Sequence, residues 1–350
     1  MKLAIISTYP PRKCGIGIYT KRLADSMHGD IRVLSLKEHT YADKKALPMI
    51  DASLWSFLNA VSYIKKNGFR TVLIEHEYAF YSKIYFLLFL FLLKLRGIKT
   101  NIEMHTIAAY DDFIKKNIFR VYNFIMFLFC NRIIVHTEYA RRKLLGAGMS
   151  KRKIRVLKLA IPNGKKLAAK RTGKIKLLCF GFIWHDKGTD IALRAFGSLK
   201  NIELKIVGSI NPGATGKQRI YFENIKKMAQ KHKNITVIDR FVSEQEKEKL
   251  YAEADFIILP YRMISQSAVL TEIWSHGKIP VSSDLAPLKE EIGKNEYGIL
   301  FASSDAQALR NAVMSVAHDG AMQKRILLNI RCLAKKRSFT ETARQIEELQ

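Results

Sequence analysis

The sequence predicts an α/β protein made of two doubly wound domains with parallel sheets. Three observations support this fold class. Short runs rich in β-branched residues alternate with helix-length amphipathic segments, which is the pattern of repeated βαβ units. The alternation begins again near residue 175, after a lysine-rich stretch that contains Pro162, Asn163 and Gly164. The length of 350 residues also favours two domains over one.

The predicted elements follow one another with similar spacing in the two halves. In the first half, strands are expected at residues 2–7, 31–36, 71–75, 100–104, 132–136 and 153–157, and helices at 18–27, 54–66, 82–95 and 112–129. In the second half, strands are expected at residues 175–181, 202–207, 235–238, 256–259, 280–282 and 298–301. Apolar residues at helical spacing, Phe339, Ala343, Ile346 and Leu349, predict a terminal helix.

The most unusual feature of the composition is its charge. The chain has 59 lysines and arginines against 31 aspartates and glutamates, a formal net charge of +28. Between Asp112 and Asp186 the only acidic residue is Glu138, while basic residues recur throughout. A solvated face is one explanation. We favour a basic surface that meets a polyanion, such as an anionic membrane, a phosphorylated substrate or nucleic acid.

The cysteines and the apolar runs limit the setting of the protein. Cys14, Cys130, Cys179 and Cys332 are far apart and have no CxxC spacing, so they suggest neither a zinc site nor a disulfide framework. The longest apolar run, residues 85–93, has about half of the roughly 18–20 residues that span a bilayer. We expect a cytoplasmic protein, either free or peripheral on the inner face of the membrane.

Glycines and polar residues gather after two predicted strands of the second half. Residues 180–188 read FGFIWHDKG, where a glycine lets the backbone approach a ligand and Lys187 suits a diphosphate. Residues 265–272 read SQSAVLTE, where the helix N–H groups at Ser267 and Ala268 favour an anion. Glu272 is placed to accept hydrogen bonds from ribose hydroxyls. Alternatively, Lys187 is an ordinary surface lysine in a turn, and Glu272 is an acid that is favourable in the first turns of any helix.

These motifs resemble those of the retaining glycosyltransferases of family four, which have the GT-B fold. Four segments match in order: residues 9–17 (YPPRKCGIG), like the family's glycine-rich N-terminal loop, residues 180–188, residues 207–209 (VGS), and residues 265–280. The likeness covers nearly the whole chain. It implies a Rossmann-like acceptor domain at residues 1–165 and a Rossmann-like nucleotide-sugar domain at 166–335, facing each other across a central cleft. A terminal helix at 336–350 is expected to pack back on the first domain.

The resemblance also implies roles for single residues. Gly15 and Gly17 would face the donor diphosphate and sugar, and Lys187 would bind the diphosphate. Further donor contacts would come from Gly181, Gly208, Arg240, Phe241, Gln266, Ser267, Ala268 and Glu272. His105 matches a strand-end histidine that faces the donor sugar and the acceptor, so His105 and Lys187 are the catalytic candidates.

Two departures from the family pattern stand out. The family usually has an arginine a few residues before the lysine, where this chain has Phe182, Ile183 and Trp184. The family also has a pair of acids eight residues apart. Glu272 matches the second acid of this pair, and this chain has Ile264 in place of the first. The first departure bears on the affinity for the diphosphate and the second on recognition of the sugar.

The first half supplies candidates for the acceptor side. His76, His105 and His136 end three successive predicted strands, so they would line one rim, with Arg12 also on this side. The segments 85–93 and 118–129 are apolar nearly throughout, and cations follow the first of them. Buried crossover helices would explain these segments, and so would an anionic membrane that carries a lipid-linked acceptor.

The expected activity is transfer of a hexose of mannose or glucose type from a nucleoside diphosphate sugar, with retention, to a hydroxyl. The acceptor would be a glycan or lipid-linked, as in surface polysaccharide or glycolipid biosynthesis. No DxD-like cluster follows a predicted strand, so we expect no metal and no cofactor, with Lys187 and helix N-termini stabilising the leaving diphosphate. The alternatives are a nucleic-acid-modifying glucosyltransferase, which the charge suits, and a non-catalytic GT-B binding protein. Nucleic acid is the less favoured partner.

Overall fold

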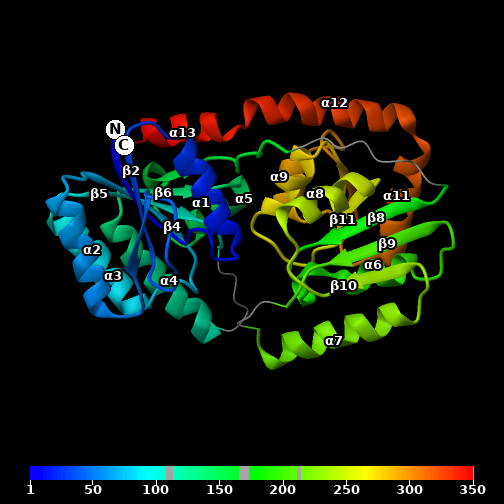
Figure 1. The fold of residues 1–350 in the computed structure, drawn as a ribbon, viewed down its shortest axis with the longest axis horizontal. Coiled ribbons are helices and arrows are strands. Elements are labelled where there is room, and N and C mark those ends of the chain that lie inside the picture. Colours follow the sequence, from blue (N-terminus) through cyan, green and yellow to red (C-terminus); the bar gives the residue numbers. More distant parts are fainter. Residues whose placement is uncertain (108–112, 165–172, 211–213, 350) are drawn as a thin grey trace. The chain divides into compact units, whose positions relative to one another are not determined.

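The computed structural model describes residues 1–107, 113–164, 173–210 and 214–349. It divides the chain into two compact units, each with one parallel sheet and helices on both sides (Figure 1). Unit 1 is Met1–Ala160 with Phe339–Gln350, and unit 2 is Ile161–Ser338. The boundary therefore follows Ala160, where the sequence placed it after residue 165. The predicted fold class of two doubly wound parallel sheets is confirmed.

In its described residues, unit 1 has a seven-stranded sheet of order β3-β2-β1-β4-β5-β6-β7. The strands are β1 (Lys2–Ile6), β2 (Asp30–Leu36), β3 (Ala46–Ile50), β4 (Thr71–His76), β5 (Lys99–Met104), β6 (Arg132–Val135) and β7 (Ile154–Val156). The helices are α1 (Gly15–Ser26), α2 (Leu54–Lys66), α3 (Lys83–Leu95), α4 (Phe113–Phe129) and α5 (Glu138–Gly146). Strand β3 was not predicted. It lies at the sheet edge, which tolerates Pro48, a residue without an N–H group.

Each face of the unit 1 sheet carries its own hydrophobic core. Because side chains alternate along a strand, Ile6 faces a core with α2, α3 and α4, and Ile5 faces a core with α1. The C-terminal helix α13 (Phe339–Glu348) packs beside α1 in this second core and buries Ala343 and Ile346 (Figure 1). The guanidinium of Arg132 also donates to the Leu349 carbonyl oxygen. Residues from the two ends of the chain therefore share one core.

In its described residues, unit 2 has a six-stranded sheet of order β10-β9-β8-β11-β12-β13. The strands are β8 (Ile175–Phe180), β9 (Ile202–Val207), β10 (Ile235–Ile238), β11 (Phe256–Leu259), β12 (Ile279–Ser283) and β13 (Ile299–Phe301). The helices are α6 (Thr189–Phe196), α7 (Gly216–Gln230), α8 (Glu244–Glu253), α9 (Ala268–Ser275), α10 (Ala286–Ile292), α11 (Ala306–His318) and α12 (Gly320–Lys336). Strand order reverses between β8 and β11. In doubly wound sheets such a switch point leaves a crevice at the carboxyl ends of the strands.

Candidate functional site

Two groups of polar residues lie at the carboxyl ends of the sheets, one in each unit. We call Gly188, Gly208, Lys187, Tyr261 and Ser267 the lysine site, which is in unit 2. We call Tyr19, Glu75, Glu103, His105 and His136 the histidine cluster, which is in unit 1. Each group borders the switch point of its own sheet, at β8 and β11 for the lysine site and at β1 and β4 for the histidine cluster.

The backbone of the lysine site depends on glycines. Gly208 follows β9 with φ +154°, and a Cβ there would lie 1.9 Å from the Gly181 carbonyl oxygen. Gly188 has φ +63°, and its Cβ would lie 1.8 Å from the Pro260 carbonyl oxygen. Only glycine, which lacks a Cβ, readily adopts a positive φ and lets another backbone segment approach this closely. The loops after β8, β9 and β11 are thereby held against one another.

Lys187 ends a short 3₁₀ turn after β8 and reaches across to the loop after β11. Its Nζ lies 4.0 Å from the centroid of the Tyr261 ring, a cation–π contact. Burial lowers the pKa of Lys187 to about 8, and the nearby Asp186 offsets part of this effect. Within the described residues no carboxylate forms an ion pair with Lys187. The Lys187 ammonium is buried against an aromatic ring and has no carboxylate partner. It is therefore suited to bind an anionic ligand.

Ser267 brings the N-terminus of α9 to the same place. Its hydroxyl caps the helix by accepting from the Leu270 N–H at 3.2 Å. Ala268 is exposed and α9 has no acidic residue in its first turn. The partial positive charge of the helix N-terminus therefore adds to that of Lys187. Gln266 precedes this cap and is partly exposed.

Glu272 lies one turn further along α9 and is held by a lysine that the sequence analysis missed. The Glu272 Oε2 is 2.9 Å from Nζ of Lys247 on α8, and this lysine is only 7% exposed. Lys247 also pairs with Glu244 at 2.9 Å. No motif marks Lys247, since it meets Glu272 only when α8 packs beside α9. The carboxylate is thus oriented by a buried cation.

Arg240 and Phe241 follow β10, which is separated from β8 by β9. Arg240 forms a bidentate pair with Glu246, at 2.7 and 2.5 Å, and Phe241 is 49% exposed. Both side chains lie two strands away from Lys187. Contact with a nucleotide base stays a prediction for them.

The loop after β1 contains the predicted glycine-rich segment of unit 1. Gly15 begins α1, and the preceding Cys14 provides no side-chain cap. Gly17 is buried, and a Cβ there would lie 3.3 Å from the Tyr9 amide nitrogen. Arg12 is paired with Glu38 at 2.6 Å. The N-terminus of α1 therefore has no side-chain cap and lies close to the end of β1.

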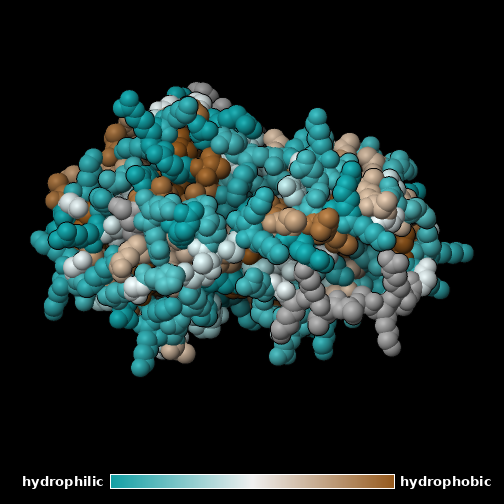
Figure 2. Space-filling model, turned by 90° about the horizontal axis from the view of Figure 1, so that it is seen from above, coloured by the Kyte–Doolittle hydropathy of each residue, from teal (hydrophilic) through white to brown (hydrophobic). Residues whose placement is uncertain are grey.

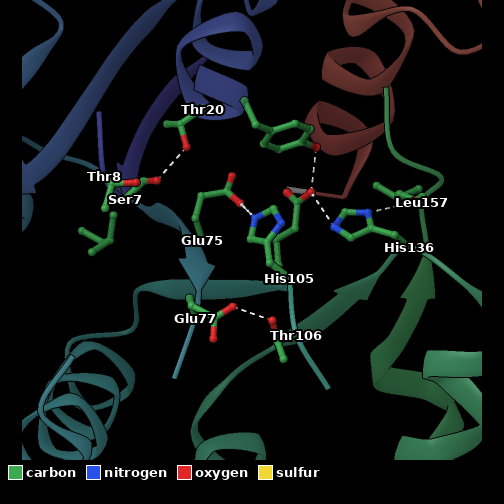
Figure 3. A network of polar contacts seen from close by, with 12 residues as sticks. Ser7, Thr8, Thr20, Glu75, Glu77, His105, Thr106, His136 and Leu157 are labelled. Carbon is green, nitrogen blue, oxygen red and sulfur yellow. Dashed lines mark hydrogen bonds and ion pairs between the residues drawn. The ribbon is translucent and has the colours of Figure 1, made fainter. Parts of the chain in front are cut away.

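The two glutamates and two histidines of the histidine cluster are buried. Figure 3 shows how these side chains contact one another. The His105 Nε2 is 2.5 Å from Glu75 Oε2, and the Tyr19 hydroxyl donates to Glu103 Oε1 at 2.7 Å. The His136 Nε2 lies 3.3 Å from the same Glu103 oxygen, and its Nδ1–H donates to the Leu157 carbonyl at 2.8 Å. Burial raises the pKa of both glutamates to about 8 and lowers that of His105.

His76 does not join the other two histidines. Glu75 and His76 are successive residues of β4, so they face opposite sides of the sheet. The His76 ring packs against Tyr78 and Phe86 and is 1% exposed, and burial lowers its pKa to about 3. The structure therefore brings His105 and His136 together, and it places His76 in the aromatic core and not on the expected rim.

The acids of this cluster were missed from sequence, although a signal was present. Glu75 directly follows the apolar run of residues 72–74, and Glu103 stands two residues before His105. Among the described residues, one donor atom each from Glu103, His105 and His136 lies within 4.8 Å of the others, an arrangement that could take a metal ion. Independence from metals stays a prediction.

The chain is similar to known glycosyltransferases in part of its sequence and in its fold. Residues 162–331, nearly all of unit 2, match the family model described as "Glycosyl transferases group 1". No curated protein sequence matches the chain significantly. Solved structures match over nearly the full length.

Three solved structures illustrate the match. A glycosyltransferase from Rickettsia africae is 16% identical with a TM-score of 0.77, covering 99% of this chain and 97% of its own. The sucrose-phosphate synthase of Thermosynechococcus elongatus is 15% identical with a TM-score of 0.76, covering 100% and 98%. Anabaena HepE, solved with UDP and glucose, is 14% identical with a TM-score of 0.80, covering 100% and 99%. At these identities the structures establish the fold alone.

Proposed function

We propose that the chain is a glycosyltransferase that transfers a hexosyl group, because residues 162–331 match the family model of group 1 glycosyltransferases. The donor is a nucleoside diphosphate sugar and the acceptor is a hydroxyl of a glycan or a lipid-linked sugar. The anomeric configuration is retained, as expected for family four. No metal takes part in this proposal.

The observation that carries the proposal is the environment of Lys187. Departure of the diphosphate is the difficult step, because negative charge develops on the leaving group. Lys187, at 4.0 Å from the Tyr261 ring, and the α9 N-terminus at Ser267 supply positive charge without an acid that competes for it. Donors that are already oriented in this way typically contribute a large share of catalysis.

Glu272 supports the assignment of a nucleotide to this site. It stands one turn along the helix whose N-terminus would receive the diphosphate, and acids bind ribose hydroxyls in comparable nucleotide sites. Its pair with Lys247 fixes one oxygen of the carboxylate. The family's arginine is missing, since this chain has Phe182, Ile183 and Trp184 in that stretch, so more of the diphosphate charge is left to Lys187.

The acceptor side is proposed from the surface of α3 and α4, which pack against each other. Each helix buries one apolar face in the unit 1 core and exposes another. On α4 the exposed residues form a stripe at helical spacing: Ile118, Val121, Phe124 and Leu128, between 47 and 58% exposed. On α3, Ile84 and Leu95 are 75 and 67% exposed. Lys94 and Arg96 stand at the end of α3.

An apolar helix surface edged by cations favours an anionic membrane interface. Figure 2 shows one face of the molecule, on which hydrophobic residues break a surface that is mainly hydrophilic. No described helix combines the length and apolar character needed to cross a bilayer. We therefore propose contact with the membrane surface, where a lipid-linked acceptor would be presented.

The donor proposal is tested by thermal unfolding of the full chain with UDP-glucose, UDP-galactose, GDP-mannose and ADP-glucose. A ligand at about 100 times its Kd stabilises the native state by about 2.7 kcal/mol, which is a measurable rise in Tm. UDP-glucose comes first because HepE has been solved with it. Proton NMR of the product made from the stabilising donor then reports whether the anomeric configuration is retained. If no donor raises the Tm, the proposal fails.

The membrane proposal is tested by co-sedimentation with vesicles of anionic phosphatidylglycerol or of neutral phosphatidylcholine. Ile118→Ser, on the α4 stripe, should reduce binding to anionic vesicles severalfold. Ile220→Ser is the matched control, because Ile220 is also exposed, at 64%, but lies on α7 of unit 2. Equal loss in both variants, or equal binding to both vesicles, would contradict the proposal.

A further inference from the structure

The segment that carries Lys187 is tied to the loop after β11 by one arginine, Arg262. The two terminal nitrogens of this side chain donate to the two carboxylate oxygens of Asp190, at 2.8 and 2.7 Å, which makes a bidentate pair. Its Nη1 also donates to the His185 carbonyl oxygen at 2.9 Å. The Arg262 backbone N–H donates to the Asp186 carbonyl oxygen at 2.8 Å. Arg262 therefore holds the chain on both sides of Lys187.

Asp190 is a fixed partner for this arginine. It lies in the first turn of α6 and is only 8% exposed. Its carboxylate also accepts from the Tyr221 hydroxyl at 2.6 Å and pairs with Arg194 at 2.9 Å. Burial opposes ionisation of Asp190, but the hydrogen bonds from Arg262 and Tyr221 and the charges of the two arginines lower its pKa to about 2. The carboxylate is therefore ionised at neutral pH, and both of its oxygens are engaged.

Arg262 also stands next to the aromatic ring that contacts Lys187. Tyr261 immediately precedes it in the chain, and the Lys187 Nζ lies 4.0 Å from the centroid of that ring. This contact requires the turn of residues 185–187 and the loop after β11 to be aligned with each other. Arg262 joins these two segments through both its backbone and its side chain. Because a buried ion pair often adds little to stability, the informative feature is which segments the pair joins.

We propose that Arg262, paired with Asp190, is a positioning residue that holds the Lys187 ammonium at the Tyr261 ring, where it is ready for the diphosphate of the donor. A lysine side chain is flexible, so fixing its backbone and the ring that it contacts reduces the entropy that is lost when a ligand binds. The position of the ammonium follows from contacts within unit 2. Its role toward a diphosphate rests on the proposed function.

Arg262→Lys changes these contacts without changing the charge of the site. Lysine presents a single nitrogen in place of the planar fork, so it cannot hold both Asp190 oxygens and the His185 carbonyl in the same geometry. A second variant, Asp190→Asn, breaks the same pair from the other side, because an NH₂ group replaces one accepting oxygen. Arg194→Lys is the matched control. Arg194 pairs with the same carboxylate from one turn along α6, so its pair stays within that helix.

The first measurement is ¹H–¹³C NMR of the full chain labelled at the lysine Cε, without ligand, with the Lys187 signal assigned through Lys187→Met. The ring current of an aromatic side chain shields protons that lie over its face. The Lys187 ε protons should therefore resonate upfield of the usual lysine position in the native protein and in Arg194→Lys. In Arg262→Lys and Asp190→Asn the signal should move toward the usual position.

Two results of this measurement would overturn the proposal. A Lys187 signal at the usual position in the native protein would mean that the ammonium is not held at the ring, whether or not the variants fold. An unchanged upfield signal in a folded Arg262→Lys or Asp190→Asn variant would mean that the pair does not hold it. A role of Arg262 in global stability alone would leave the signal of the folded protein where it is.

Calorimetric titration with UDP tests whether Arg262 acts through Lys187. Arg262→Lys should raise the Kd by about 10-fold, comparable to the loss of a residue that orients a metal ligand. In a Lys187→Met background the same substitution should change the Kd by at most about twofold, because the group that Arg262 positions is already absent. Arg194→Lys should leave the Kd of the native protein within about twofold. A 10-fold loss that persists in the Lys187→Met background would mean that Arg262 contacts the ligand directly, which overturns the proposal.

The two measurements separate this proposal from the proposed function. If the native protein binds no UDP, the proposed function fails, and the Lys187 signal still decides whether Arg262 holds the ammonium. If the signal moves as expected in Arg262→Lys and the Kd for UDP does not change, Arg262 positions Lys187 but the part of the proposal that concerns the diphosphate is wrong.

Discussion

Replacing Lys187 by methionine removes one positive charge from the lysine site while keeping most of its volume. Lys187 has no ion-pair partner among the described residues, so the substitution leaves no carboxylate uncompensated. The Tyr261 ring loses a cation–π contact and keeps an apolar neighbour. We therefore expect the variant to fold, with a Tm equal to or above that of the native protein.

The loss should appear in the binding of UDP. A hydrogen bond to a charged group is worth about 1.5–3 kcal/mol, and the buried position of Lys187 favours the upper part of this range. A loss of about 2–3 kcal/mol corresponds to an increase in Kd of about 30- to 150-fold. The measurement is isothermal titration calorimetry of the full chain with UDP at pH 7.

Lys200→Met provides the control. Lys200 is exposed and precedes β9, so it lies at the amino ends of the strands, opposite the lysine site. Its substitution should leave the Kd within about twofold. A folded Lys187→Met variant that binds UDP with the native affinity would refute the reasoning about this site.

The pH dependence of binding tests the same charge independently. The pKa of Lys187 is lowered to about 8 in the ligand-free protein, and a bound diphosphate would raise it again. Below about pH 8 the ammonium is present and contributes fully. Above it, binding requires proton uptake, so affinity should fall by up to about tenfold per pH unit. Lys187→Met should lack this fall.

Three further predictions concern single side chains. Glu272→Gln should weaken UDP binding about tenfold in calorimetry, because a ribose hydroxyl loses a charged acceptor, and should leave binding of 2′,3′-dideoxyuridine diphosphate within about twofold. Ile346→Ala should lower the unfolding free energy in urea by about 2–5 kcal/mol, because this fully buried side chain joins α13 to the core. Gly208→Ala should destabilise by at least about 2 kcal/mol in the same assay, while Gly216→Ala, at an open helix start, should be neutral or stabilising.

These predictions are refuted by specific results. Equal losses for UDP and its dideoxy analogue would remove Glu272 from the ribose site. An Ile346→Ala change below about 1 kcal/mol would mean that α13 adds little to unit 1. Equal effects of the two glycine substitutions would contradict the close approach of Gly208 to Gly181.

The sequence predicted features that depend on short-range patterns. Alternating β-branched runs and amphipathic segments marked the two parallel sheets, because their periods reflect which face of each element is buried. Lys187, Ser267 and Glu272 could be named as candidates from the sequence because strand-end loops and helix starts are local signals. The edge strand β3 was missed, since Pro48 and a length of five residues make it read as a loop.

Contacts between residues on different strands and helices could not be predicted without the tertiary structure. The sequence places Glu75 and Glu103 in two predicted strands, but only the parallel register of β4 and β5 makes them neighbours, although they are 28 positions apart in the chain. The same holds for Lys247 and Glu272, which meet because α8 packs beside α9. The sequence by itself determined the fold class and the position of the lysine site, since both follow from local spacing. The tertiary structure alone decided which buried charges are paired, because pairing depends on strand order and helix packing.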